Sequence, residues 1–306
     1  MSGPSSPPRV DLKEVLAGAQ LAALPQSAIR LLELSREPAN GPAEFAVPIE
    51  ADPGLTGQVL KFVNSSYFGF AREISSVNLG LKLVGVRTIK NFALWNAIFS
   101  LVPNPKCGTL DLKNLWQDSL RRALFGRAAA RLVGVKAVDD AFTAALLQDM
   151  AVPVLAKAVP QVYLKLIEAR YDGKNRLSAL ERRVLGWTHG EAAGLLARQW
   201  NLPEDLVVLI EGHAEIPRWS DDSATGRLGL CVALSALLPS TADPLWVECR
   251  TFEQHYEAVV PPGSPSVAEL LEQVDREYVE FAPVMKMTTP AKSLGECYQE
   301  MVSPAS

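Results

Sequence analysis

The chain has 306 residues, of which 48% are hydrophobic, so it can bury the core of one large domain or two ordinary ones. Its formal net charge of -4 argues against a general electrostatic grip on nucleic acid or anionic lipid, because both require clustered lysine and arginine. We therefore expect a folded globular protein that binds neither nucleic acid nor a membrane.

The cysteines and the N-terminal residues bear on the cellular compartment. No C-x-x-C pair is present, which indicates reduced thiols rather than a zinc knuckle or a redox dithiol. The N-terminal residues lack the basic segment and apolar run of a secretory signal, and no window approaches about 18 continuous apolar residues. A cytoplasmic location is the resulting expectation.

The first part of the chain reads as helical. Residues 1–10 are rich in serine and proline and are expected to be disordered, and a helical subdomain is expected over 11–102. A short helix is expected from Pro42 to Glu50, interrupted or ended near Pro48. Residues 77–83 alternate with period two and could by themselves form a strand, but the helical spacing that follows in 86–101 favours a helix.

The stretch from Asp52 to Phe70 has the most distinctive pattern. Asp52 and Pro53 are typical of a helix start, and the polar residues 64–66 are expected to stop that helix. Three aromatic residues then surround Gly69, namely Tyr67, Phe68 and Phe70. They are candidates either for packing one half of the protein against the other or for a surface that faces a partner.

A break rich in proline and glycine at 102–110 precedes a second group of helices over 111–213. The first of these helices carries Arg121, Arg122, Arg127 and Arg131, which we interpret as a solvated helix face rather than a phosphate-binding stripe. Thr188 and Glu191 have the spacing of a capping box, so a helix should begin at His189. The helical spacing of residues 206, 209, 210 and 213 points His213 inward. Residues 214–306 are expected to form a C-terminal helical extension.

Residues 52–65 read D-P-x-L-x-x-x-x-L-x-x-x-N-S and are followed by an aromatic residue and a glycine. This run resembles the HDOD family, the HD-related output domain of bacterial signalling proteins. Leu24-Pro25, Ile74-Ser75-Ser76 and Leu83-Val84-Gly85 continue the resemblance, and a third block ends near His213. The ordered motifs span roughly two thirds of the chain, which makes them more specific than any one motif.

The resemblance implies an all-α fold and a relation to the HD superfamily of metal-dependent phosphohydrolases. That superfamily is named for a His-Asp pair which, with further histidines and an aspartate, holds the metal that activates water. Here the corresponding pair reads Gln148-Asp149, and an amide is a poor replacement for imidazole. The other positions that the resemblance assigns to this site are Asp118, His189 and His213.

Two interpretations of these residues stay open. They can be structural, with Asp149 and the two histidines each satisfied by a local hydrogen bond. Alternatively Asp149, His189 and His213 could form a set of two histidines and one carboxylate that holds a metal. We predict no catalytic residue, no metal and no cofactor.

The resemblance implies a regulatory function in bacterial signal transduction, exerted through contacts with a protein partner rather than by turnover. The chain contains no receiver, GGDEF-like or EAL-like segment, so we expect a stand-alone module. The alternatives are a residual metal-dependent phosphohydrolase acting on nucleotides or cyclic dinucleotides, and a nucleotide sensor that binds without cleaving. No phosphate-binding loop, G-x-G-x-x-G or G-x-S-x-G motif competes with these interpretations.

Overall fold

The computed structural model of the chain describes residues 11–19, 22–170 and 173–303. Within these ranges every regular element is a helix, and the β-type pairing is limited to an isolated bridge between Cys107 and Leu110. The all-α prediction is confirmed, including the helical choice for residues 77–84. The expected disorder of residues 1–10 falls outside the described part of the chain.

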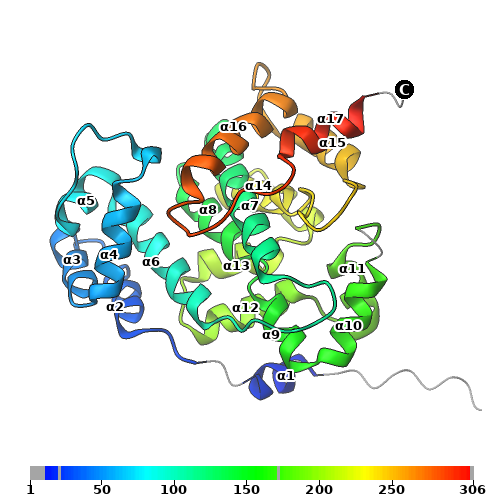
Figure 1. Cartoon of the computed structure of the whole chain (residues 1–306), viewed down its shortest axis with the longest axis horizontal. Coiled ribbons are helices and arrows are strands. Elements are labelled where there is room, and N and C mark those ends of the chain that lie inside the picture. Colours follow the sequence, from blue (N-terminus) through cyan, green and yellow to red (C-terminus); the bar gives the residue numbers. More distant parts are fainter. Residues whose placement is uncertain (1–10, 20–21, 171–172, 304–306) are drawn as a thin grey trace, which may run out of the picture.

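The N-terminal helices form a group at one edge of the molecule, drawn in blue and cyan in Figure 1. Their bounds are α2 (Gln26–Leu34), α3 (Pro42–Glu50), α4 (Pro53–Val63), η1 (Ser66–Phe68), α5 (Val77–Val84) and α6 (Val86–Leu101). The first helix, α1 (Leu12–Gly18), packs instead on α9 and α12 in the second half of the chain. The first helix of the chain therefore lies beside helices that are distant from it in sequence.

Local signals around α4 act as the sequence predicts. The Asp52 carboxylate accepts a hydrogen bond from the Leu55 amide at 3.0 Å, which caps the first turn. Asn64 follows the helix, and its side-chain amide exchanges two hydrogen bonds with the backbone of Ile74, at 2.7 and 2.8 Å. The expected bounds of α3, Pro42 to Glu50, are confirmed, but the helix is not interrupted at the buried Pro48 and ends two residues after it. Packing of α3 on α2 and α5 offsets the hydrogen bond that proline cannot donate.

The second group of helices begins with α7, which packs on α8, α14 and α16. The group consists of α7 (Leu112–Leu132), α8 (Val138–Leu147), α9 (Ala151–Ala158), α10 (Pro160–Ala169), α11 (Leu177–Leu185), α12 (His189–Gln199) and α13 (Glu204–Gly212). Residues 138–158 are apolar and long enough to span a membrane by composition, but 83% of that window is buried inside the fold. This stretch is therefore part of the hydrophobic core.

The interpretation of the α7 arginines as a solvated face was wrong for three of the four. Arg121 is 2% exposed and donates to the Lys292 carbonyl, and Arg127 is 4% exposed and pairs with Glu277 at 2.9 Å. Arg122 is also largely covered, and only Arg131 is exposed as expected. Because α7 is covered on several sides, its arginines are paired with carboxylates and carbonyls distant in sequence rather than solvated.

The remaining helices are η2 (Ile216–Trp219), α14 (Ala224–Ser235), α15 (Cys249–Val259), α16 (Val267–Phe281) and α17 (Leu294–Val302). Of these, α14 packs on α7 and α8 and α16 packs on α7, while η2 and α15 contact α14 and α17 contacts α16. On α16 the side chain of Tyr278 is buried, whereas that of Val279 is exposed. Cys107, Cys231, Cys249 and Cys297 are all free thiols, as predicted.

Candidate functional site

Three of the residues that sequence analysis selected come together in the interior. Asp149 lies in the turn between α8 and α9, His189 is the first residue of α12, and His213 follows the end of α13. One potential ligand atom from each lies within 4.8 Å of the others, and all three side chains are buried. The third histidine of the chain, His255, lies on α15 outside this cluster.

The start of α12 brings the two histidines together. Thr188 and Glu191 form the predicted capping box, in which the Thr188 amide donates to the Glu191 carboxylate at 2.7 Å. Gly190 lets the helix approach α13 closely, since a Cβ atom there would lie 2.7 Å from the Glu211 carbonyl oxygen. The His189 and His213 Nε2 atoms are consequently 3.1 Å apart.

Glu181 on α11 fixes the ring of His189 from the opposite side. Its Oε2 lies 2.6 Å from His189 Nδ1 and also accepts from the His189 amide at 2.7 Å. Tyr163 donates its hydroxyl to the other oxygen of Glu181. Burial disfavours an imidazolium, but the carboxylates of Glu181 and Asp149 outweigh burial and raise the pKa of His189 to about 10. Sequence analysis missed Glu181, because no local motif marks it.

His213 has the opposite electrostatic environment. Its Nδ1 lies 2.7 Å from the Ile210 carbonyl oxygen and donates to it, which leaves Nε2 as an acceptor facing His189. Burial and the charge of His189 lower the pKa of His213 to about 3. At neutral pH the pair therefore consists of a charged His189 that donates and a neutral His213 that accepts.

The Asp149 carboxylate contacts both a histidine and an arginine. Its Oδ1 lies 3.3 Å from His189 Nε2, and its Oδ2 accepts from the Arg122 guanidinium. Burial opposes ionisation, yet Arg122 and the histidines hold the pKa of Asp149 well below its usual range. Sequence analysis named Arg122 only as part of a solvated helix face and missed its role in this cluster. The signal that could have revealed this role is its position one helical turn after Asp118.

The two other positions assigned by resemblance have separate surroundings. The Asp118 carboxylate accepts from the Ser240 hydroxyl at 2.6 Å and from the Thr241 amide at 2.8 Å. Burial raises the pKa of Asp118 against the opposing effect of Arg122. Gln148 is fully buried, and neither atom of its amide has a hydrogen-bond partner among the described residues.

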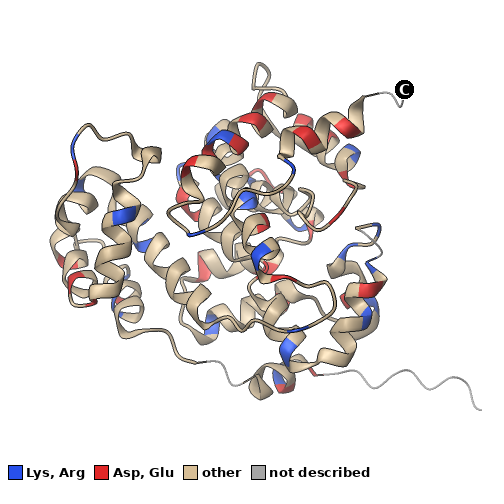
Figure 2. Cartoon of the chain, viewed as in Figure 1, with Lys and Arg blue, Asp and Glu red and all other residues tan. Residues whose placement is uncertain are grey.

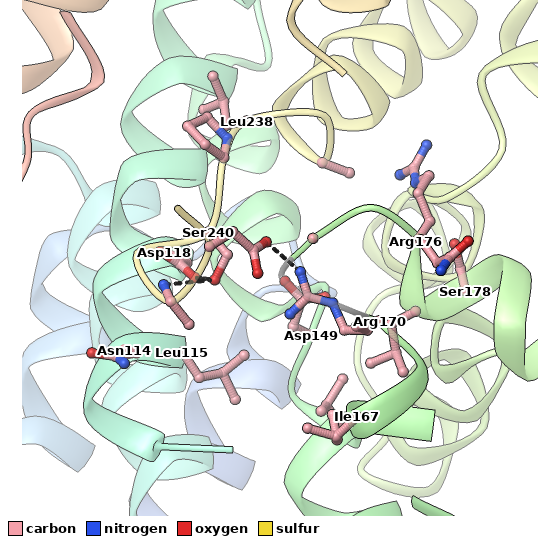
Figure 3. Close-up of a pocket in the computed structure, with 18 of the residues that line it drawn as sticks. Asn114, Leu115, Asp118, Asp149, Ile167, Arg170, Arg176, Ser178, Leu238 and Ser240 are labelled. Carbon is pink, nitrogen blue, oxygen red and sulfur yellow. Dashed lines mark hydrogen bonds and ion pairs between the residues drawn. The ribbon is translucent and has the colours of Figure 1, made fainter. Parts of the chain in front are cut away.

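A cavity of about 520 Å³ opens beside the cluster. Figure 3 shows Asn114, Leu115 and Asp118 of α7 on one side, Arg170, Arg176 and Ser178 on the other, and Asp149 between them. The arginines of the cavity are paired with carboxylates: Arg122 with Asp149, Arg170 with Asp243 and Arg176 with Glu248. The cavity thus has a mixed polar and apolar lining, in which each of these arginines faces a carboxylate.

As paired and charged in this structure, the cluster does not fit a resident metal ion. Gln148 supplies no imidazole, and Asp118 is hydrogen-bonded to the loop that carries Ser240. The guanidinium of Arg122 already neutralises Asp149, while each histidine Nε2 faces the other. A divalent ion would have to displace a permanent cation from the one carboxylate of the cluster.

The aromatic turn lies away from this cluster and joins two parts of the fold. Phe281 of α16 packs edge-on against Tyr67, with ring centroids 5.1 Å apart, and Arg127 lies over the Tyr67 ring at 4.8 Å. Phe68 packs against Phe62 at 5.0 Å. Phe70 is 38% exposed, so it is the residue of the turn that remains available to a partner.

The HDOD domain family model matches residues 21–216. The chain belongs to the HDOD family. The matched segment of this HDOD protein contains Asp118, Gln148, Asp149, His189 and His213 together with Arg122 and Glu181.

The relatives of this HDOD protein support the same fold. An uncharacterized protein of Treponema pallidum (strain Nichols) is 27% identical over 200 residues, which is 63% of this chain and only 38% of that protein. The crystal structure of an HDOD domain protein of unknown function from Geobacter sulfurreducens matches with a TM-score of 0.69 and 22% identity, covering 91% of this chain and 99% of that one. A candidate phosphohydrolase from Shewanella amazonensis SB2B has the same TM-score with 19% identity, covering 90% and 97%.

Proposed function

We propose that this HDOD protein is a non-enzymatic regulatory module of bacterial signal transduction that acts through contacts with a protein partner. The observation that carries the proposal is the ion pair between Arg122 and Asp149 at the centre of the HD-type cluster. A protein that activates water with a metal needs an open coordination position and free donor atoms. Here the donors are engaged with one another and with a guanidinium.

The electrostatics of the cluster support the same conclusion. The proton on His189 and the charge of Arg122 both neutralise Asp149, and Glu181 balances His189. The cluster also links α7, the α8–α9 turn, α11, α12 and α13 through one network. A buried network of this kind ties these helices together, which suits a module that presents a fixed surface to a partner.

The partner surface is proposed at the aromatic turn, where Phe70 is exposed while Tyr67 and Phe68 hold the turn in place. The surface charge gives no reason to prefer nucleic acid, because acidic residues accompany the basic ones along the helices in Figure 2. Capture from the native host with wild-type protein and with Phe70→Ser tests this. A specific partner lost in Phe70→Ser supports the proposal, and capture of no specific partner by the wild type contradicts it.

Turnover assays test the non-enzymatic part directly. Protein supplied with Mn²⁺, Fe²⁺ or Ni²⁺ is assayed against bis-p-nitrophenyl phosphate, nucleotides and cyclic dinucleotides, with His213→Ala as the control. We expect no difference between the wild type and His213→Ala. Phosphate-ester hydrolysis that His213→Ala abolishes would establish the alternative, a metal-dependent phosphohydrolase.

The cavity favours a second candidate function, binding of a nucleotide without cleavage. Its volume of about 520 Å³ lies within the range of small-molecule sites, and Arg122, Arg170 and Arg176 line it. A phosphate group would compete for these arginines with Asp149, Asp243 and Glu248. Calorimetry against a nucleotide panel decides between a sensor, which gives saturable heat that Arg170→Gln weakens, and a module without a nucleotide ligand.

A further inference from the structure

We propose that Arg122 is the permanent cation of this cluster, unlike His189, whose proton can leave, and that the charge of Arg122 is what keeps a divalent transition metal out. Asp149, His189 and His213 would then form a latent metal site that opens when Arg122 is made neutral. This inference rests on the proposed loss of metal-dependent chemistry, and it assigns that loss to a residue outside the HD pair.

The donor atoms are already placed as metal ligands require. Both histidines direct Nε2 towards Asp149, at 3.3 Å for His189 and 3.9 Å for His213. Their Nδ1 atoms are held by Glu181 and by the Ile210 carbonyl, at 2.6 and 2.7 Å. Outer hydrogen bonds of this kind orient histidine ligands in metal sites. Two imidazoles and one carboxylate suit Zn²⁺, Co²⁺ or Fe²⁺.

The guanidinium of Arg122, whose charge excludes the metal, is held in place by its neighbours. Arg122 extends from α7 to Asp149, its side chain is 13% exposed, and Asp118 and Asp243 also interact with it. A guanidinium does not lose its charge in a protein, so it cannot yield to a metal by releasing a proton. At short range in a buried site, a unit charge opposes a divalent ion strongly. Asp149 can therefore serve the arginine or a metal, but not both.

Substitution of Arg122 tests the inference through metal binding alone. Arg122→Gln and Arg122→Met remove the charge at similar length, whereas Arg122→Lys keeps a charge. Co²⁺ affinity is measured by equilibrium dialysis with elemental analysis, and coordination is followed by the visible absorption of the bound ion. We expect the neutral variants to bind one Co²⁺ at least about 100-fold more tightly than the wild type, and Arg122→Lys to resemble the wild type.

Controls separate a built site from adventitious binding. Adding Asp149→Asn or His213→Ala to Arg122→Gln should abolish the gain. Arg170→Gln is the matched control, because it removes a guanidinium that is paired with a carboxylate, Asp243, in the same cavity. This variant should leave Co²⁺ affinity at the wild-type level.

Three results would overturn the inference. They are tight stoichiometric Co²⁺ binding by the wild type, equal binding by Arg122→Lys and Arg122→Gln, and absence of binding by a neutral variant that circular dichroism shows to be folded. The wild-type measurement decides even if both neutral variants fail to fold. Phosphate-ester turnover by the wild type would instead contradict the proposed function, so the two failures are distinguishable.

Discussion

Glu181 Oε2 lies 2.6 Å from His189 Nδ1, and this contact makes a carboxylate on α11 the positioning partner of the first residue of α12. The same oxygen accepts from the His189 amide, and Tyr163 donates to the other oxygen. A residue without any motif around it therefore fixes the orientation of the ring that faces Asp149.

Loss of Glu181 should destabilise the protein strongly. Glu181→Ala leaves a buried imidazolium and a buried tyrosine hydroxyl without their partner, so we expect the free energy of unfolding to fall by about 3–5 kcal/mol. Urea denaturation followed by circular dichroism measures this. Glu300→Ala, which breaks the exposed pair with Lys292, is the control and should cost about 0–1 kcal/mol. Equal costs for the two substitutions would show that the buried contact contributes nothing.

The two histidines should give stability a maximum near pH 6.5. Since the pKa of His189 is raised to about 10, the stabilisation that its proton supplies is complete below about pH 6.5 and declines as pH rises from 6.5 towards 10, because the unfolded chain releases this proton before the folded protein does. The pKa of His213 is lowered to about 3, so the unfolded chain takes up a proton below 6.5 that the folded protein refuses, and stability falls with acid. Urea denaturation between pH 5 and pH 9 should show both slopes. His189→Gln should remove the alkaline slope, and an unchanged slope would contradict the assignment.

Replacing Gln148 by methionine should stabilise the protein. The side chain is fully buried and its amide has no hydrogen-bond partner among the described residues. Methionine has a similar shape without the cost of an unsatisfied amide, so we expect a gain of about 1–3 kcal/mol. Thermal unfolding checks this, with Gln273→Met on the partly exposed face of α16 as the control. A loss of stability in Gln148→Met would indicate that the amide is satisfied in solution.

Phe281 should prove central to the contact between the aromatic turn and α16. Its ring, 2% exposed, packs on Phe62, Tyr67 and Phe142 at centroid distances of 5.5, 5.1 and 5.7 Å. Phe281→Ala should cost about 3–5 kcal/mol and increase hydrogen exchange in α4 and η1. Val279→Ala on the exposed side of the same helix should stay within about 0.5 kcal/mol. Exchange that rises equally in both variants would contradict a specific contact.

The sequence alone determined the elements whose causes are local. The all-α class, the cap at Asp52, the capping box before His189 and the inward direction of His213 all follow from interactions within a few residues. Spacing of this kind is fixed by the geometry of one helix, so it can be read without knowing what the helix packs against. The family resemblance and the choice of Asp149, His189 and His213 as candidate site residues also came from the sequence alone.

Only the tertiary structure decided how these residues are engaged. Arg122 reaches a carboxylate 27 residues away, and Arg127 reaches one 150 residues away, so no local pattern could distinguish them from solvated arginines. Glu181 likewise acquires its role from the packing of α11 against α12. The sequence identified the possible metal ligands, but the guanidinium that pairs with Asp149 comes from a neighbouring helix. Electrostatic partners in a buried cluster are set by distance in space, which the sequence does not give.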